Sequence, residues 1–179
     1  MSDRVFHDGE LSAQQRFNEA WDEERSKRLS RIVGSALDQR MARFVESRDF
    51  FFLATSDAEG HCDCSFKGTE PASDGRLLPA VWVAGPQCLL FPDYAGNRMF
   101  NSLGNILTNP HLGLLFIDFA SQSRLRVNGS ARILEQHGEW QTLWPQAGRA
   151  VEVAVEQVYW NCSKRIPRLN DAKTHGAQA

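Results

Sequence analysis

The amino-acid sequence predicts a mainly β fold with flanking helices, an α+β class built around an antiparallel barrel. From Phe50 onward, about seven short apolar runs are separated by turn residues at close spacing. Several of these runs alternate polar and apolar residues, which is the pattern of a strand with one buried face. The first 48 residues carry helical spacing instead. A chain of 179 residues with 42% hydrophobic residues can bury the core of a single domain.

Residues 11–48 predict two helices. In the first, LSAQQRFNEAWDEERSKRLSRIV, Ser12 is a candidate N-cap. Its apolar residues recur at roughly helical spacing, namely Phe17, Ala20, Trp21, Leu29, Ile32 and Val33. The second helix occupies about residues 35–47. Because charged residues cover most of the first helix, only a narrow stripe can pack. We expect residues 1–48 to form a helical extension that packs on a barrel of residues 49–170.

The remaining segments follow in order along the chain. FFFLATS and HCDCSFKG predict a hairpin joined at DAEG, and AVWVAG and CLLFPD predict a second pair joined at residues 85–87. A helix is expected from Arg98 to Leu107, ended by Asn109 and Pro110. HLGLLFIDF, RLRVNGSARIL and VEVAVEQVYW predict three further strands, with a short helix in EWQTLWPQ before the last. The tail, residues 171–179, is expected to be disordered.

Composition excludes several classes of protein. A formal net charge of -2 gives no electrostatic basis for binding DNA or RNA. No run of about 18 apolar residues predicts a membrane span. The N-terminus lacks a basic start followed by an apolar stretch, so no secretory signal is expected and the protein is predicted to be cytoplasmic. In that reducing compartment the four cysteines are expected to be thiols.

The grouping of His61, Cys62 and Cys64 raises the question of a zinc site. A C-x-C pair on a strand places both thiols on one face, but a structural zinc site normally uses wider cysteine knuckles with a second ligand pair. Cys88 and Cys162 lie far away in the sequence. We therefore predict buried free thiols and no metal.

Ser65 and Lys67 alternate with Cys64 and Phe66, so they share one face of their strand. A lysine supplies charge and a hydroxyl supplies a directional donor, and such a pair can hold a phosphate. By itself this combination is common on protein surfaces.

The turn before the predicted helix contains FPDYAGNRMF. Gly96 permits a positive φ or a close backbone approach, and Asn97 is a candidate cap. Arg98 is unusual in a first helical turn, where the dipole favours acidic residues. A nearby anion would explain it, because a helix N-terminus offers free N–H groups and Arg98 adds a fork that grips phosphate.

The strand SRLRVNGSAR places Arg124, Arg126 and Asn128 on one face, with Leu125 and Val127 on the other. In a barrel the polar face points out of the core, and it is either a solvated surface or part of a site. Together with the two preceding groups, these cationic residues suit a phosphorylated ligand.

The order of these motifs resembles the pyridoxamine-phosphate oxidase-like, FMN-binding split-barrel superfamily. The similarity runs from about Phe50 to Leu134, and a subgroup also shares VFHDGELSAQ and YWNCSKRIPR near the two ends. The resemblance implies a six-stranded split barrel that forms a homodimer and binds FMN at the subunit interface. The cofactor-binding residues it implies are Ser65, Lys67, Gly68, Asp93, Asn97, Arg98, Arg124, Arg126 and Lys164, with Arg124 contributed by the second subunit.

The activity implied is that of an FMN-dependent oxidoreductase acting on an unidentified small molecule. The C-terminal Arg-x-His segment with which the oxidases hold pyridoxal phosphate is not found, so vitamin B6 oxidase activity is not expected. The alternative is a non-catalytic barrel that binds a flavin, a deazaflavin or haem. No Ser–His–Asp set or catalytic carboxylate pair is recognised, and no general acid or base is assigned.

Overall fold

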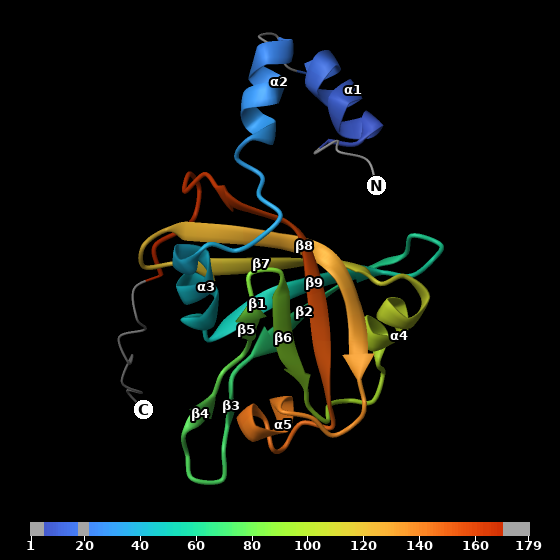
Figure 1. The fold of residues 1–179 in the computed structure, drawn as a ribbon, viewed down its shortest axis with the longest axis vertical. Coiled ribbons are helices and arrows are strands. Elements are labelled where there is room, and N and C mark those ends of the chain that lie inside the picture. Colours follow the sequence, from blue (N-terminus) through green and yellow to red (C-terminus); the bar gives the residue numbers. More distant parts are fainter. Residues whose placement is uncertain (1–5, 18–21, 170–179) are drawn as a thin grey trace, which may run out of the picture. The chain divides into compact units, whose positions relative to one another are not determined.

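The computed structural model describes residues 6–17 and 22–169 (Figure 1). The chain divides into two compact units, Met1–Gly34 and Ser35–Ala179. The first unit contains two short helices, α1 (Asp8–Phe17) and α2 (Glu23–Ser30). The domain boundary expected after residue 48 and the packing of the N-terminal helices on the barrel stay predictions. The tail 171–179 lies outside the described residues.

Helix α1 begins before the predicted cap, so the assignment of Ser12 as its N-cap is wrong. The His7 amide donates to the Glu10 carboxylate at 2.9 Å, and the His7 ring accepts from the Gly9 and Glu10 amides at 3.1 and 3.3 Å. These contacts satisfy N–H groups of the first helical turn, so His7 acts as the N-cap. Two residues of the predicted apolar stripe, Ala20 and Trp21, lie outside the described residues.

The barrel is one antiparallel sheet with the strand order β2-β1-β7-β8-β9-β6-β5. Its strands are β1 (Phe50–Ser56), β2 (Cys62–Gly68), β5 (Trp82–Gly85), β6 (Cys88–Asp93), β7 (His111–Asp118), β8 (Ser123–Leu134) and β9 (Arg149–Asn161). A separate two-stranded hairpin contains β3 (Glu70–Pro71) and β4 (Leu77–Leu78). The predicted mainly β antiparallel class with flanking helices is confirmed. The sheet has seven strands where the resemblance implied six, and β2 and β5 lie at its two ends.

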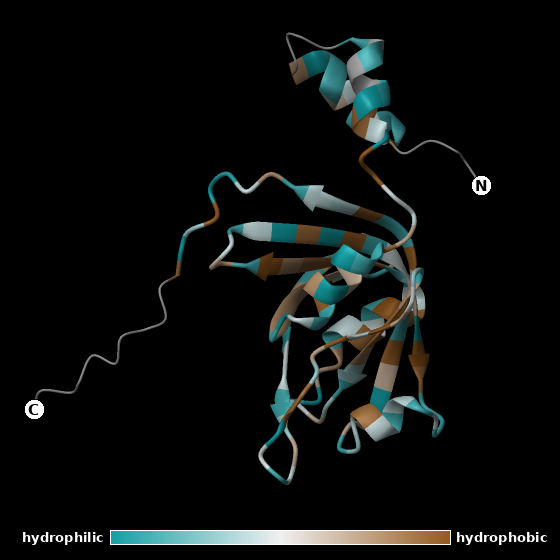
Figure 2. Ribbon diagram, turned by 60° about the vertical axis from the view of Figure 1, so that its left-hand side comes forward, coloured by the Kyte–Doolittle hydropathy of each residue, from teal (hydrophilic) through white to brown (hydrophobic). Residues whose placement is uncertain are grey.

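Every second side chain is buried along much of β1, β7 and β8, which is the pattern of a strand with one face in the core. Figure 2 shows hydrophilic and hydrophobic residues alternating along them. In β1 the side chains of Phe51 and Leu53 are fully buried while Phe50 and Phe52 are only partly covered. The side chains of one apolar face of the sheet therefore pack together and form the main core, which includes Phe51, Leu53, Leu89, Phe91, Leu114, Phe116, Leu125, Val127, Val151, Val153 and Val158.

Helix α3 (Gln39–Glu46) belongs to the same unit as the barrel. Asp38 caps it by accepting from the Met41 amide at 2.7 Å. Val45 is fully buried in the main core, and the Glu46 carboxylate accepts from the Val83 amide at 3.1 Å. The helix thus covers the barrel next to β5.

Strands β8 and β9 shift register at Asn128 and Gly129, and Figure 1 shows β8 as a long, strongly curved strand. A β-bulge bends a strand and lets it serve both halves of a barrel. A Cβ atom on Gly129 would lie 2.1 Å from the Ala154 carbonyl oxygen, so glycine is required at this close backbone approach.

A smaller apolar cluster lies on the outer face of the sheet, under helix α5 (Trp140–Leu143). Its buried members are Leu78, Leu90, Trp140, Trp144, Ala147 and Ala150. The Trp144 indole N–H donates to the Pro79 carbonyl at 2.6 Å, which satisfies the one polar atom of this fully buried ring.

Across residues 6–17 and 22–169, none of the helices combines the length and the apolar character that crossing a bilayer requires.

Candidate functional site

A polar pocket of about 220 Å³ lies where the edge strand β2 faces the loop between β6 and helix α4 (Asn101–Thr108). Its lining includes five residues predicted as cofactor-binding: Ser65, Lys67, Asp93, Asn97 and Arg98. Segments more than 25 residues apart in the sequence thus meet at one place. Gly68, Arg124, Arg126 and Lys164 do not line this pocket.

Strand β2 supplies one wall of the pocket. Asp63, Ser65 and Lys67 pair with the buried β1 residues Thr55, Leu53 and Phe51, so they share the inner face of the sheet. The intervening side chains, Cys62, Cys64 and Phe66, are exposed on the opposite face. The predicted alternation in this strand is confirmed.

A chain of hydrogen bonds runs along this wall. The Ser102 hydroxyl is 3.0 Å from the Ser65 hydroxyl and donates to the Asp63 carboxylate at 3.3 Å. Because Ser102 has one proton to give, the bond between the two serines takes its proton from Ser65. Ser102 is buried, with 7% of its surface exposed. Sequence reasoning missed both Asp63 and Ser102, although the alternation already placed Asp63 on the face of Ser65.

The loop that follows β6 differs from the prediction. Helix α4 begins at Asn101, so Arg98 precedes the helix and Asn97 does not cap it. The Asn97 side-chain oxygen instead accepts from the Met99 amide at 3.0 Å, which forms a turn before the helix. Arg98 and Phe100 adopt left-handed backbone angles, with φ of 64° and 55°. The positive φ anticipated at Gly96 falls on these two residues.

Helix α4 is fixed to the barrel on its inner side. Leu103 and Ile106 are buried in the main core. The Asn105 amide donates to the Thr55 hydroxyl at 3.0 Å, and the Asn109 amide donates to the Ser56 hydroxyl at 3.0 Å. These two bonds hold the middle and the C-terminal end of the helix against β1, the strand that pairs with β2.

Asp93 lies on the far side of the pocket and is already paired. Its carboxylate accepts from the Arg149 guanidinium at 2.7 Å, and that guanidinium lies 5.3 Å from the centre of the Phe100 ring. The Asp93 side chain is therefore satisfied by a protein cation. Arg149 links the end of β6 to the left-handed turn, a role that its sequence position gave no reason to expect.

Tyr94 also lines the pocket. Burial, with a smaller contribution from the Glu70 charge, raises the pKa of its phenol to about 12. Its buried hydroxyl finds no hydrogen-bond partner within residues 6–17 and 22–169. Tyr94 is thus neutral at physiological pH, and its buried O–H donor is unpaired within the described residues.

Arg124 and Arg126 project from the opposite face of the sheet. They pair in register with Ile117 and Leu115 of β7, and Leu115 pairs with the outward Phe52 of β1. The Arg126 guanidinium donates to the Tyr159 hydroxyl at 3.0 Å. The predicted outward direction of this strand face is confirmed, and these two residues do not meet Ser65 and Lys67 within one chain.

Arg124 lies opposite Asn161 in the β8–β9 register. The Nε of Arg124 and the side-chain oxygen of Asn161 are both buried, and neither has a partner in the described part of the chain. Lys164 is exposed in the segment after β9, and Gly68 ends β2. These predicted residues are dispersed around the barrel.

Aromatic side chains gather on the same outer face, beside β1 and β2. The Phe50 ring stacks on Phe66 at 5.0 Å and lies 6.3 Å from Phe119, while Phe52 lies 5.9 Å from Phe50. Phe66 is 61% exposed. This outer aromatic cluster, Phe50, Phe52, Phe66 and Phe119, is an apolar patch on an edge of the sheet.

The residues weighed for zinc do not converge. All four cysteines are free, and Cys62, Cys64 and Cys162 are exposed, so the expectation of buried thiols is wrong for these three. Cys62 and Cys64 lie on the outward face of β2, and Cys162 lies just after the end of β9.

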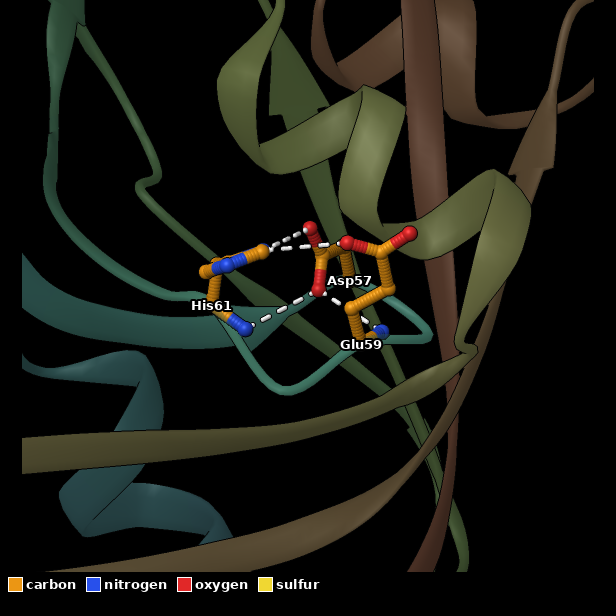
Figure 3. Close-up of side chains that lie close together, drawn as sticks. All are labelled: Asp57, Glu59 and His61. Carbon is orange, nitrogen blue, oxygen red and sulfur yellow. Dashed lines mark hydrogen bonds and ion pairs between the residues drawn. The ribbon is translucent and has the colours of Figure 1, made fainter.

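His61 instead faces Asp57 and Glu59 at the β1–β2 turn (Figure 3), where one ligand-type atom from each lies within 4.8 Å of the others. The His61 ring is 2.8 Å from Asp57, whose other oxygen accepts from the Glu59 and His61 amides. The His61 side-chain bond lowers the pKa of the Asp57 carboxyl. These hydrogen bonds stabilise the β1–β2 turn, and this structural role explains why the three side chains lie close together.

The family follows from comparison with known proteins. Residues 37–170 match the sequence profile described as pyridoxamine 5'-phosphate oxidase. The chain belongs to the pyridoxamine 5'-phosphate oxidase family. The match spans the whole seven-stranded sheet and the pocket described above.

Solved structures share the family's fold. HupZ from Group A Streptococcus is 14% identical, with 75% of this chain and 99% of HupZ covered and a TM-score of 0.55. A putative pyridoxamine 5'-phosphate oxidase from Lactobacillus delbrueckii is 20% identical, with coverage of 70% and 95% and a TM-score of 0.53. An FMN-binding protein from Syntrophomonas wolfei is 9% identical, with coverage of 78% and 95% and a TM-score of 0.52. Among curated proteins, none matches this chain significantly.

Proposed function

We propose that this member of the pyridoxamine 5'-phosphate oxidase family binds FMN and uses it as an oxidoreductase acting on a small molecule. One observation carries the proposal. Two cationic side chains and a chain of hydroxyl and carboxylate groups line the same pocket, at the edge strand β2.

Two cationic side chains of the pocket suit a phosphate. Lys67 offers a point charge from the strand, and Arg98 offers a planar fork from the loop. Arg98 has a left-handed backbone conformation and precedes helix α4, so it lies in the loop and not in the helix. Charge-assisted bonds of this kind are about twice as strong as neutral ones.

The carboxylate and hydroxyl groups on β2 suit hydroxyl groups of a ligand. Asp63 is an acceptor when ionised, and Ser65 keeps lone pairs after it donates to Ser102. A carboxylate repels a phosphate, so the phosphate belongs at Lys67 and Arg98 and a polyol belongs beside Asp63. The ribityl phosphate tail of FMN has this order of groups. Haem propionates bring no hydroxyl donors for Asp63, which favours a flavin.

The pocket is too small for a whole FMN molecule. Sites for drug-sized ligands occupy roughly 300–1,000 Å³, whereas this pocket measures about 220 Å³. It would hold the phosphate and part of the polyol, and the flavin ring would lie outside it.

A second copy of the chain would complete the site. The outer aromatic cluster is an exposed apolar patch that dimerisation would cover. Arg124 lies on that same outer face with a buried Nε that has no partner in the described residues. We propose that each subunit presents this face to the cofactor held by the other, as the resemblance implied.

The isoalloxazine ring, when bound, supplies the hydride or electron transfer. The residues of this chain would hold the tail at Lys67 and Arg98 and fix the polyol at Asp63. Asp93 is held by Arg149 and is thereby kept from competing for the cationic residues of the pocket.

Titration of the purified protein with FMN, followed by quenching of flavin fluorescence, tests the binding part of the proposal. Saturable binding is expected, with haem bound more weakly. Reduction of the complex by NADH or NADPH under anaerobic conditions, followed by reoxidation with candidate acceptors, tests catalysis. A protein that binds FMN but shows no turnover with any tested pair of electron donor and acceptor would support the non-catalytic alternative. A protein that does not bind FMN would refute the proposal.

A further inference from the structure

A second, larger pocket lies on the outer face of the sheet. It measures about 910 Å³ and lies between β5, β6, β8 and β9 on one side and the loop 135–139 leading into α5 on the other. It shares no lining residue with the pocket at β2. The volume is that of a site for a small organic molecule.

The walls of this second pocket are aromatic and aliphatic. Trp82 comes from β5 and Trp140 from the start of α5. Trp140 is a buried member of the smaller apolar cluster under α5, and Trp82 packs against that cluster. Leu90 and Leu134 add aliphatic surface, and half-buried Cys88 lies among them. An indole face attracts cations and also stacks on flat apolar groups.

The charge around the second pocket is negative. Its lining includes three carboxylates, those of Glu135, Glu139 and Glu152, and one guanidinium, that of Arg132. Arg132 is already bound to Glu152 at 2.6 Å. Glu135 and Glu139 are exposed, and neither forms an ion pair with another residue in the described ranges. The pocket therefore offers two tryptophans and an uncompensated acidic rim.

We propose that the second pocket binds a small organic cation, a protonated or quaternary amine on an apolar body. The apolar body lies against Trp82, Leu90 and Leu134, while the cation lies near the carboxylates of Glu135 and Glu139. An anion would meet these carboxylates with repulsion, and a neutral molecule would gain only the apolar contact. The site is independent of the flavin site, because no residue belongs to both.

Three probes with the same body test this charge selectivity: 3-phenylpropylamine, 3-phenylpropanol and 3-phenylpropionate. Binding is followed by tryptophan fluorescence and by protection of Cys88 from alkylation, in a protein with Cys62→Ser, Cys64→Ser and Cys162→Ser. Burial raises the pKa of the Cys88 thiol, so alkylation is run at alkaline pH, still below the range where the amine loses its proton. The amine is expected to bind about tenfold more tightly than the alcohol, and the carboxylate not to bind.

Variants locate the site. The double variant Glu135→Gln, Glu139→Gln is expected to lose the preference for the amine over the alcohol. The variant Trp82→Leu is expected to bind both the amine and the alcohol more weakly. Glu156→Gln, an exposed glutamate elsewhere on β9, is the matched control and is expected to change neither. Equal binding of all three probes, or no protection of Cys88 by the amine in the folded triple-serine protein, would overturn the proposal.

Discussion

At the scale of single residues, the flavin proposal depends on Arg98. Its guanidinium lines the pocket from a left-handed backbone position, ahead of the helix in which the sequence predicted it. Arg98→Ala removes a charge-assisted contact to phosphate, so FMN binding should weaken by about 1.5–3 kcal/mol, or roughly 10- to 150-fold. Titration calorimetry measures this change. Arg76→Ala, on the β3–β4 hairpin, is the control. Unchanged FMN affinity in Arg98→Ala would show that the phosphate lies elsewhere.

Asp63 is the residue that we propose favours a polyol beside the phosphate. Asp63→Asn keeps the shape of the side chain but removes the charge that accepts hydroxyl protons and repels phosphate. When inorganic phosphate competes with FMN for Asp63→Asn, the preference of the protein for FMN over phosphate is expected to be roughly tenfold lower than in the parent. Asp74→Asn, in the β3–β4 turn, should leave the preference as it was. A preference that is unchanged or greater in Asp63→Asn would place the polyol away from this carboxylate.

At the scale of elements, the sheet bends at Gly129. Gly129→Ala places a methyl group against the Ala154 carbonyl, so one strand must move. We expect a loss of roughly 1–3 kcal/mol in the free energy of unfolding, measured by urea denaturation. Gly104→Ala, in helix α4 with no neighbouring atom within 4 Å of the new carbon, is the control. It should leave stability unchanged or raise it by about 0.5–1 kcal/mol. Equal stability of the two variants would mean that the bulge is not constrained.

The strands were predictable because burial of one face determines them. The alternation in β2 and β8 placed Ser65 with Lys67, and Arg124 with Arg126, and both pairs lie where the pattern indicated. This alternation can be interpreted without knowing which distant strands a segment pairs with, because the order of polar and apolar residues within the strand indicates which of its faces is buried.

The helix boundaries and polar partners were less predictable. Helix α4 starts late because the Asn97 side chain bonds two residues ahead, and this local turn competes with the helix. Ser102 meets Ser65 across 37 residues of sequence, and Arg149 meets Asp93 across 56. Such contacts depend on how the sheet curves and brings distant segments together, which no short pattern encodes.

At the scale of the whole molecule, the site residues fall into two sets on opposite faces of one sheet. Within a single chain the set at the pocket and the set around Arg124 do not meet, and we propose that a homodimer brings them together. Phe66→Asp puts a charge into the outer aromatic cluster and is expected to convert dimers to monomers and to weaken FMN binding. Sedimentation velocity measures the first effect. Leu77→Asp, on the separate hairpin, is the control for an exposed apolar residue.

A parent protein that sediments as a monomer while saturated with FMN would refute the shared site, because one chain would then suffice. A Phe66→Asp dimer with normal affinity would move the interface to another face.

The central claim is that the pocket at β2 holds the ribityl phosphate tail of a flavin. The most direct measurement is the visible absorption spectrum of the protein as purified, with the released cofactor identified by mass. A yellow protein that releases FMN is predicted, together with loss of the colour in the double variant Lys67→Ala, Arg98→Ala. A folded protein that carries no FMN and takes up none when it is added, or a double variant that remains as yellow as the parent, would contradict the claim.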